Sequence, residues 1–588
     1  MQDTWSLDIY YKGYEDVQFQ KDLEDCRKLV ADLPDVMNEA KRKGGMAGLE
    51  QIMLAKEAFQ KAVNRVGEYV FFRQSTDTTD SETVSFVNEI GKIKAKAAPV
   101  NAALKQFVAA FSEEEMKQME QESEVLGAYA FYFDCLREEA EHSFSEEMEG
   151  MIAKMNLSGA NAWSRLFDFL TSTLKVDYEG KEITLSDVRN LAFSEQKEVR
   201  KAAYEAELAA YEKVEAPIAF ALNHIKNQVT MLSSERGYES PLQMTLVQSH
   251  MKQETLDAML TAIREYLPVF HGYLKGKAEY LGDQNGLPWY DLFAPVGKSD
   301  HKYSLEEAKE YLVTSFADFS QESADLIERA FDEHWIDFYP RKGKVGGAFC
   351  SEVTHAKQCR ILTNFSGTFE SVDTLAHELG HAFHSQQIFD HRVLNQLYPM
   401  QVAETASTFN ETHITKRAIS KADGEERLAL LESFVSNTTQ TICDIYSRFL
   451  FEDEVFHRCE KEFLMPEDLK AIMVKAQKEA YGDGLDANAM HPYMWACKGH
   501  YYIDDLSYYN FPYAFGAMFA MGLYTQFEKE GTDFVPKYKA LLKATSVKSV
   551  EDTAKMAGID ITKPDFWRES LASFEKMIKE LAQIWKSC

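Results

Sequence analysis

The chain has 588 residues, too many for one ordinary domain, and its few proline (14) and glycine (29) residues argue against long disordered linkers. Its formal net charge of −30 disfavours binding to nucleic acid and to anionic membranes. The eight cysteines are dispersed and form no CxxC motif, which is typical of free thiols in a reducing compartment. Without a signal-like N-terminus or an apolar run of about 18 residues, we expect a soluble cytoplasmic protein.

Helical patterns begin near residue 16 and dominate the chain. The clearest amphipathic face lies in residues 47–72, where apolar side chains recur at helical spacing. Residues 82–155 continue in the same way, a pattern that suits antiparallel helices in a bundle. These observations predict a mainly α fold.

Two interruptions of the helical pattern organise the middle of the chain. Residues 176–185 predict a small hairpin, because two short β-branched runs flank a Glu-Gly pair. We place a domain boundary beside it, between an N-terminal helical domain over residues 1–190 and a second domain over residues 191–588. Residues 281–297 form the largest break, rich in glycine, proline, asparagine and aromatic residues, and predict a loop that lines a site.

A Gly-rich, extended stretch at residues 339–350 precedes an apolar, β-branched stretch at residues 359–365. We interpret the two as a short antiparallel β pair in an otherwise helical protein. Gly346 and Gly347, followed by Ala348, let another backbone come close, which favours an edge strand that binds a peptide by strand addition. The alternative is a structural hairpin with a glycine bulge.

Residues 374–385, TLAHELGHAFHS, contain an HExxH motif. On a helix, residues four apart stand one turn above each other, so His377 and His381 project to one side and can bind a single zinc ion. Glu378 lies beside them, where it can deprotonate a water molecule. A separate apolar stripe supports an amphipathic helix rather than a chance match; it comprises Val372, Leu375, Ala376, Leu379, Ala382 and Phe383.

A zinc site for hydrolysis needs a third protein ligand. The metzincin pattern would require glycine at position 384 and histidine at 387, but these positions hold His384 and Gln387. In gluzincins the third zinc ligand is a glutamate on a following helix. Residues 401–414 predict that helix and carry Glu404, which we assign as the third ligand. His391 and Glu411 remain alternatives.

Other polar residues near the motif have roles around the ligands. A ligating histidine usually donates its other ring N–H to a carboxylate or carbonyl, and Asp373 and Glu411 are candidates for that acceptor. His384 lies on the same stripe as the ligands and is a candidate for a supporting or substrate contact. A satisfied polar residue on a helix surface is the alternative for each of them.

A second polar and aromatic cluster occurs in residues 499–516, GHYYIDDLSYYNFPYAFG. Tyrosine hydroxyls and a histidine N–H are neutral donors that can stabilise the oxyanion formed during peptide hydrolysis. The alternative is an aromatic packing region of the core.

Together, HELGH, the VAETAST segment at residues 402–408, the GGAFC stretch and the GHYY…YYNFPYAFG cluster resemble the thimet oligopeptidase family of zinc metallopeptidases, in particular its oligoendopeptidase F-like members. The resemblance covers residues 190–580 well and the N-terminal part more loosely. It implies a large, nearly all-α peptidase with a deep central channel, a zinc ion at the channel floor, a small β element beside it, and short unstructured peptides as substrates. The domain over residues 1–190 would cover the channel, and the domain over residues 191–588 would be catalytic.

Carried over residue by residue, the resemblance implies one Zn²⁺ ion bound by His377, His381 and Glu404, with Glu378 as general base. It also implies that His500 and Tyr513 contact the substrate or the oxyanion. Because this chain has one extra residue between His500 and Tyr513, the second tyrosine of the family pattern could be Tyr502, Tyr508 or Tyr509, and we choose Tyr509. Tyr502 is also a substrate-binding candidate.

These inferences predict a zinc endopeptidase. An exopeptidase, such as a dipeptidyl carboxypeptidase or a metallocarboxypeptidase, is the alternative, and it would need a cationic anchor for the terminal carboxylate of the substrate, for example Arg341, Lys342 or Lys498. A non-enzymatic peptide-binding protein is a third interpretation, which the complete ligand set disfavours. The expected partners are short peptides, without nucleic acid or membrane; the oligomeric state is not predicted.

Overall fold

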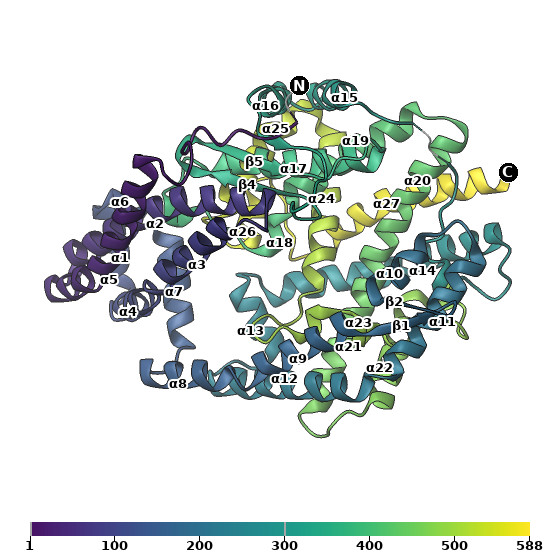
Figure 1. Ribbon diagram of the computed structural model, residues 1–588, viewed down its shortest axis with the longest axis horizontal. Coiled ribbons are helices and arrows are strands. Elements are labelled where there is room, and N and C mark those ends of the chain that lie inside the picture. The colour runs from purple at the N-terminus through teal and green to yellow at the C-terminus, as the bar shows by residue number, and fades with distance from the viewer. Residues whose placement is uncertain (1–2, 299–300, 588) are drawn as a thin grey trace. The chain divides into compact units, whose positions relative to one another are not determined.

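The computed structural model describes residues 3–298 and 301–587 (Figure 1). Helices account for 72% of the structure, and within the described residues the sheets are two small ones, of two and three strands. The prediction of a mainly α fold with a small antiparallel β element is therefore confirmed. The central channel stays a prediction.

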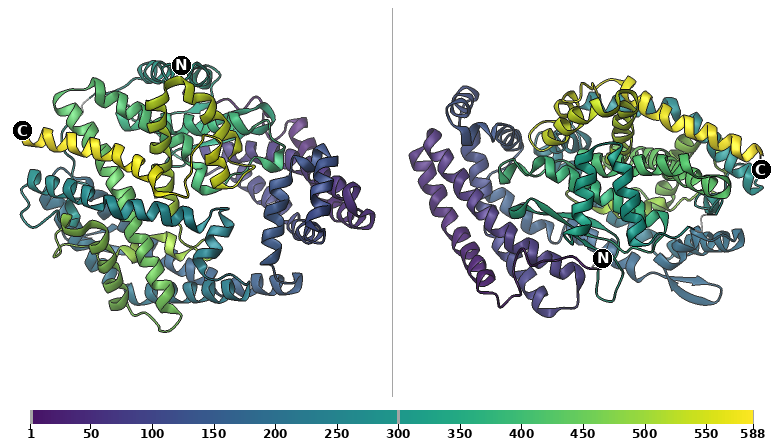
Figure 2. Two further views of the ribbon diagram at one scale, coloured as in Figure 1. Left: turned by 180° about the vertical axis from the view of Figure 1, so that it is seen from behind. Right: turned by 90° about the horizontal axis from the view of Figure 1, so that it is seen from above.

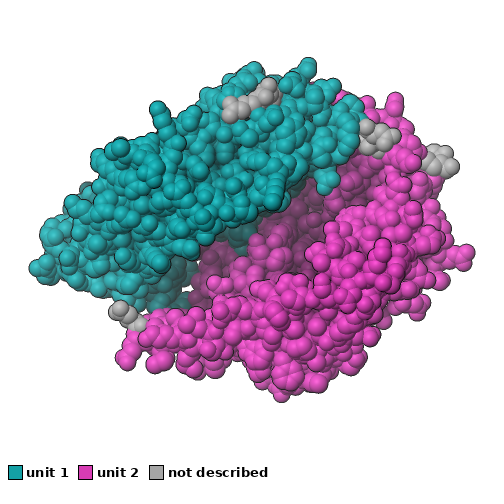
Figure 3. All heavy atoms as spheres, in the orientation of Figure 1, with its two compact units in different colours: residues 1–143, 301–414, 526–558 teal, residues 144–300, 415–525, 559–588 magenta. Residues whose placement is uncertain are grey.

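The chain divides into two compact units (Figure 3). Unit 1 comprises Met1–Ser143, His301–Ile414 and Gln526–Gly558, and unit 2 comprises Phe144–Asp300, Thr415–Thr525 and Ile559–Cys588. The units are interleaved along the chain, and the boundary that we place at residue 190 falls inside unit 2. That boundary stays a prediction.

Unit 1 contains the N-terminal helices and the three-stranded sheet. Its elements are α1 (Val17–Lys43), α2 (Gly45–Thr76), α3 (Ser81–Ala95), α4 (Ala98–Ala109), α5 (Glu113–Glu122), α6 (Glu124–Gly127), α7 (Ala130–Glu141), α15 (Leu305–Ala317), α16 (Gln321–Asp332), β3 (Ile336–Asp337), β4 (Phe349–Val353), β5 (Gln358–Leu362), α17 (Phe369–Ile388), α18 (Met400–Ala403), α25 (Val535–Ala544) and α26 (Val550–Lys555).

Unit 2 contains the two-stranded hairpin and the remaining helices. Its elements are α8 (Glu146–Asn156), α9 (Ala160–Thr173), β1 (Lys175–Tyr178), β2 (Lys181–Thr184), α10 (Leu185–Asn190), α11 (Lys197–Glu212), α12 (Glu215–Glu235), α13 (Pro241–Gln248), α14 (Gln253–Leu281), α20 (Gly424–Thr439), α21 (Ile445–Cys459), α22 (Pro466–Tyr481), α23 (Met494–Cys497) and α27 (Pro564–Ser587). Helices α19 (Thr405–Lys421) and α24 (Phe511–Glu530) contain residues of both units.

The long helices α1 and α2 lie side by side and form the first hairpin of unit 1 (Figures 1 and 2). Asp16 caps α1 by accepting a hydrogen bond from the backbone of Gln18, and α1 ends at Lys43, followed by the capping residue Gly44 with a φ of 63°. The apolar face predicted in residues 47–72 is buried, including Ile52 and Val66 at 0% exposure. This hairpin is the scaffold of the unit 1 core.

The hairpin lies where it was predicted, and a β pair is also present, but its first strand, β4, begins at Phe349, near the end of the predicted stretch over residues 339–350. Strands β1 and β2 are antiparallel. The larger sheet has the order β3-β5-β4, in which β4 pairs antiparallel with β5 and lies at one edge. Strands β4 and β5 both pack against α17, the helix that carries HExxH. The sheet thereby places an edge strand beside the candidate metal ligands.

Candidate metal centre and aromatic cluster

Helix α17 holds the HExxH motif on the predicted amphipathic helix. Thr368 is its N-cap and accepts a hydrogen bond from the backbone of Ser371. Each residue of the predicted apolar stripe is at most 2% exposed. Burial of this stripe fixes the rotation of the helix, so that His377 and His381 share the opposite, partly exposed side.

The ligand atoms converge at this side of α17. The Nε2 atoms of His377 and His381 lie 3.1 Å apart, and each lies 3.3 Å from Oε2 of Glu404. A tetrahedral zinc ion with metal–ligand distances of about 2.0–2.1 Å separates its ligands by roughly 3.3 Å. Among the residues that the structure describes, no other three His, Cys, Asp or Glu side chains gather in this way. The donor set therefore fits a zinc ion.

The surroundings of Glu404 favour its charged form, which can bind a cation. Burial raises the pKa of the Glu404 carboxyl, but hydrogen bonds from His377 and His381 outweigh burial and hold the pKa well below its usual range. The hydroxyl of Ser407 also donates to Oε2 of Glu404, at 2.7 Å. Glu404 is therefore an ionised carboxylate with a fixed orientation.

Glu378 lies next to the ligand group and is 5% exposed. Its Oε2 atom is buried, and no described residue gives it a hydrogen bond. Burial raises the pKa of the Glu378 carboxyl, against the opposing effect of His377 and His381. A carboxylate with a raised pKa and an unused oxygen is suited to accept a proton near neutral pH.

Glu404 does not lie inside a helix, contrary to the helix predicted over residues 401–414. It is the residue between α18 and α19, with φ −88° and ψ 10°. The contact between α17 and α19 explains how it reaches the histidines. A Cβ atom on Gly380 would lie 2.5 Å from the carbonyl oxygen of Ala406 and 2.6 Å from Cα of Ser407. The glycine of HELGH thus allows direct backbone packing, a role that the sequence interpretation missed.

The three candidates for supporting contacts behave differently. Nδ1 of His377 donates to Oε1 of Glu411 at 2.8 Å, which turns Nε2 toward the ligand group. Asp373 lies one turn before His377 on α17. His384 is fully buried, hydrogen-bonds with the hydroxyl of Thr545 at 2.8 Å and stacks on Tyr398, so it contacts no ligand. The side chain of His384 therefore points into the core and not toward the metal centre.

The alternative ligand His391 is also accounted for by the fold. Its Nε2 atom hydrogen-bonds to the backbone carbonyl of Lys543 at 2.7 Å. It does not belong to the group formed by His377, His381 and Glu404.

The bend before β4 contains Gly346, Gly347 and Ala348. These residues lie outside the strand, whereas the sequence predicted an extended stretch over residues 339–350. Gly347 has a φ of 76°, which ends the extended conformation. No atom lies within 4 Å of a Cβ built on Gly346 or Gly347, so both backbones face open space. Their contact with substrate stays a prediction.

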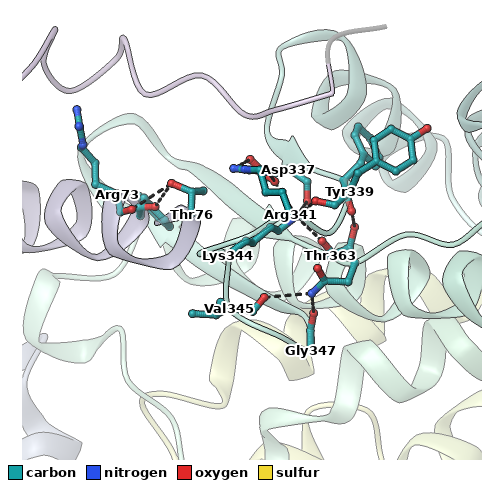
Figure 4. Close-up of polar contacts among 12 residues, drawn as sticks. Arg73, Thr76, Asp337, Tyr339, Arg341, Lys344, Val345, Gly347 and Thr363 are labelled. Atoms are coloured by element: carbon teal, nitrogen blue, oxygen red, sulfur yellow. Dashed lines mark hydrogen bonds and ion pairs between the residues drawn. The ribbon is translucent and has the colours of Figure 1, made fainter. Parts of the chain in front are cut away.

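A network of polar side chains holds this bend (Figure 4). The ammonium of Lys344, with a fully buried side chain, donates to the carbonyls of Tyr339 (2.9 Å) and Thr363 (2.6 Å) and pairs with Asp337. The amide of Asn364 donates to the carbonyls of Val345 and Gly347, at 3.1 and 2.8 Å. The bend before the edge strand is therefore positioned by side chains that sequence reasoning did not single out.

Arg341 is committed to the same network. It makes a bidentate ion pair with Asp337, with nitrogen–oxygen distances of 2.6 and 2.9 Å. Its charge is therefore compensated, which weakens it as an anchor for a substrate carboxylate.

In unit 2, the predicted aromatic cluster is assembled as a group of three rings. The ring of His500 lies 5.0 Å from that of Tyr509 and 5.8 Å from that of Tyr513, and the two tyrosine rings are 5.4 Å apart. Tyr513 is 39% exposed. Burial and the nearby cations Arg448 and Lys498 lower the pKa of His500, which favours the neutral imidazole.

Two other tyrosines of this segment belong to the core. Tyr502, predicted to bind substrate, is 2% exposed, stacks on Phe167 at 3.8 Å and donates its hydroxyl hydrogen to the carbonyl of Trp495. It cannot contact substrate in this conformation. Tyr508 is also 2% exposed and donates to Asp453, which agrees with the choice of Tyr509 over Tyr508.

A buried acid shapes the loop that carries Tyr509. Glu452, 1% exposed, accepts hydrogen bonds from Lys226 (2.6 Å), from the backbone N–H of Tyr508 (3.1 Å) and from the amide of Asn510 (2.7 Å). Tyr508 has a φ of 53°, a strained value for a non-glycine residue. The ion pair between Lys226 and Glu452 therefore holds a strained turn around Tyr509, and no sequence signal indicated it.

The model of Peptidase family M3 matches residues 190–573, and that of Oligopeptidase F matches residues 108–175. The chain is 27% identical over 598 residues to oligopeptidase PepF of Bacillus subtilis, covering 99% of this chain and 87% of that protein. It is 24% identical over 603 residues to an oligoendopeptidase F homolog of Lactococcus lactis, covering 99% and 97%.

Solved structures share the fold. A crystallised protein of Chlamydophila abortus superposes with a TM-score of 0.87 at 20% identity, covering 99% of this chain and 98% of that one. Oligoendopeptidase-F of Enterococcus faecium superposes with a TM-score of 0.71 at 19% identity, covering 97% and 99%. Within the described residues, no helix combines the length and the apolarity that a bilayer span requires.

Proposed function

Because the chain belongs to peptidase family M3, we propose that it is a zinc-dependent endopeptidase that hydrolyses internal bonds of short, unstructured peptides. The observation that carries this proposal is the convergence of His377, His381 and Glu404 beside the unpartnered carboxylate of Glu378. The names of the B. subtilis and L. lactis relatives support oligopeptides as the substrate class. We further propose that the enzyme acts in the cytoplasm.

His377, His381 and Glu404 would hold the zinc ion, with Glu411 orienting the ring of His377. When bound there, zinc supplies a Lewis acid that polarises the scissile carbonyl and lowers the pKa of the attacking water. Glu378 takes a proton from that water and delivers it to the leaving amine. Its raised pKa supports both halves of this transfer, since the carboxyl must accept and then release the same proton.

The aromatic cluster supplies neutral donors. In this proposal the hydroxyl of Tyr513, with His500 or Tyr509, donates a hydrogen bond to the oxyanion of the tetrahedral intermediate. The lowered pKa of His500 supports a neutral imidazole, which donates one N–H without adding a charge. The bend at Gly346, Gly347 and Ala348 would align the peptide backbone beside β4.

The substitution Glu378→Gln tests the assignment. It removes the proton acceptor but keeps the size of the side chain and the three ligands, so zinc content should remain about one per chain while kcat falls by about 10²–10⁴-fold. Elemental analysis and cleavage of an internally quenched peptide with blocked termini measure the two quantities. Turnover close to that of the wild type would refute the role of Glu378, and no cleavage of the blocked peptide by the wild type would refute the endopeptidase.

A further inference from the structure

A cavity of about 360 Å³ lies within unit 2. The break at residues 281–297, predicted to line a site, contributes Trp289, Tyr290 and Phe293 to its wall, and α11 contributes Tyr204. This part of the wall is aromatic and can pack against an apolar side chain of a ligand. Lys498, two residues before His500, lies in the polar part of the wall; we call this space the Lys498 cavity.

The charges around the Lys498 cavity do not balance. Arg200 is neutralised by Asp291, which is fully buried and accepts two hydrogen bonds from it at 2.9 and 2.6 Å. Arg189 lies 3.4 Å from Glu207 and donates to the backbone of the chain. The ammonium of Lys498, in contrast, makes no hydrogen bond or ion pair with any described residue.

The remaining acid of the wall is already occupied. Asp444 forms an ion pair and a hydrogen bond with Arg448, one helical turn away. Both side chains are largely buried, at 9% and 12% exposure, so this pair is retained within the protein. One ammonium group, that of Lys498, is thus left in the cavity wall without a carboxylate of its own.

A second, independent feature points to a ligand. His491 lines the cavity and is 1% exposed, yet neither of its ring nitrogens has a hydrogen-bond partner among the described residues. Its Nε2 atom lies 3.5 Å from Oε2 of Glu207, within ion-pair distance but beyond a good hydrogen bond, whereas Nδ1 has neither kind of contact. Buried polar atoms are almost always paired, with protein or with a bound molecule, so the imidazole offers Nδ1 to an occupant.

We propose that the Lys498 cavity binds the free C-terminal carboxylate of a short peptide, with Lys498 as its anchor. The aromatic wall then takes the C-terminal side chain, and His491 hydrogen-bonds with the amide groups that precede it. A carboxylate is the anion that fits, because the compensated cations leave one positive charge and the aromatic wall favours an organic body over an inorganic ion. The choice of a peptide rests on the proposed function; the carboxylate anchor does not.

Direct binding tests the anchor. Isothermal titration calorimetry of the full-length zinc-loaded protein is performed with the dipeptide Ala-Phe and with its C-terminal amide. We expect the free acid to bind at least about tenfold more tightly than the amide. Lys498→Met should abolish this difference, and Lys498→Arg should retain most of it.

Lys475→Met is the matched control, because Lys475 is an exposed lysine on α22 that does not line the cavity. It should bind both dipeptides as the wild type does. Equal affinity of the wild type for acid and amide would overturn the proposal, as would full affinity of Lys498→Met for the acid. If Lys498→Met fails to fold, Lys498→Gln removes the charge while keeping a polar side chain, and full affinity of that variant for the acid would likewise overturn the proposal.

Kinetics distinguishes the two sources of the carboxylate. If it belongs to the substrate, a peptide with a free C-terminus has a lower KM than its amide, and Lys498→Met removes this preference. If it belongs to a product, Ala-Phe inhibits cleavage of the amidated peptide by the wild type but not by Lys498→Met. Absence of any peptidase activity would refute the proposed function and leave the calorimetric result to decide on the anchor.

Discussion

The candidate metal centre of unit 1 and the aromatic cluster of unit 2 are built in different ways. The metal centre relies on a regular helix, in which the spacing of His377 and His381 follows from the helical repeat. The aromatic cluster relies on irregular chain, with a strained Tyr508 and a buried acid, Glu452, contributed by a different helix.

Because of this difference, we expect substitutions to affect the two sites in different ways. The metal centre is specified mostly by local sequence, so substitution of a ligand should affect metal binding and leave the fold intact. The turn around Tyr509 depends on a buried ion pair, and loss of one partner leaves an uncompensated charge in the core. Substitutions around that turn should therefore affect local structure and turnover together, without loss of metal.

The largest effect is expected from Glu404→Ala, which removes one of three ligands. Zinc content should fall well below one per chain, and kcat/KM should fall by about 10³-fold or more. Elemental analysis and peptide cleavage measure these quantities. Glu411→Gln is the graded control, because it removes only the partner of His377 and should weaken zinc affinity by about 10–100-fold. Stoichiometric zinc in Glu404→Ala would show that Glu404 is not a ligand.

A somewhat smaller effect is expected from Tyr513→Phe, which removes one donor from the aromatic cluster. Loss of a donor to an oxyanion lowers kcat by about 10²–10³-fold with little change in KM. Tyr502→Phe is the matched control, since its hydroxyl hydrogen is donated to the carbonyl of Trp495, and its kcat should remain near that of the wild type. If Tyr509→Phe and not Tyr513→Phe lowered kcat in this way, the donor would have to be reassigned to Tyr509.

The smallest effect on turnover is expected from Glu452→Gln, which leaves the buried ammonium of Lys226 without its counterion. Breaking such a pair costs roughly 3–5 kcal/mol, and the strained turn at Tyr508 should open more often. Hydrogen exchange of the peptide that contains residues 508–511 should accelerate, and kcat should fall about tenfold with zinc content unchanged.

The double variant Lys226→Met, Glu452→Gln tests whether the uncompensated charge is what opens the turn. It removes the uncompensated charge, so part of the exchange protection should return. Unchanged exchange in Glu452→Gln would contradict the positioning role of this pair.

Much of the metal centre could be predicted because its determinants are local. The HExxH spacing and the apolar stripe of α17 are both read within about 20 residues and agree with the structure. Glu404 was identified by its residue type and its distance along the chain, but its helical setting was wrong, because its backbone leaves the helical region between α18 and α19. Propensity does not reveal such a break, which is decided by the close packing of α19 on Gly380.

Two of the candidate site residues are buried for the same physical reason. Tyr502 and His384 lie in polar or aromatic stretches near catalytic candidates, and composition alone cannot tell whether a ring faces solvent or the core. Packing decided both, since Tyr502 stacks on Phe167 and His384 on Tyr398. The ring of Tyr509, in contrast, lies beside His500, as chosen from the sequence.

The sequence alone was enough to predict that this protein is mainly helical, that His377 and His381 share one helix face, and that an aromatic segment follows far along the chain. Those features depend on short-range periodicity, which the backbone repeat converts directly into geometry. Only the tertiary structure decided which buried charges hold the turn at Tyr508, which side chains support the bend before β4, and that Lys498 lines a cavity without a counterion. Such relations join residues distant in sequence, and they arise from burial, which forces every polar group either to find a partner or to offer one to a ligand.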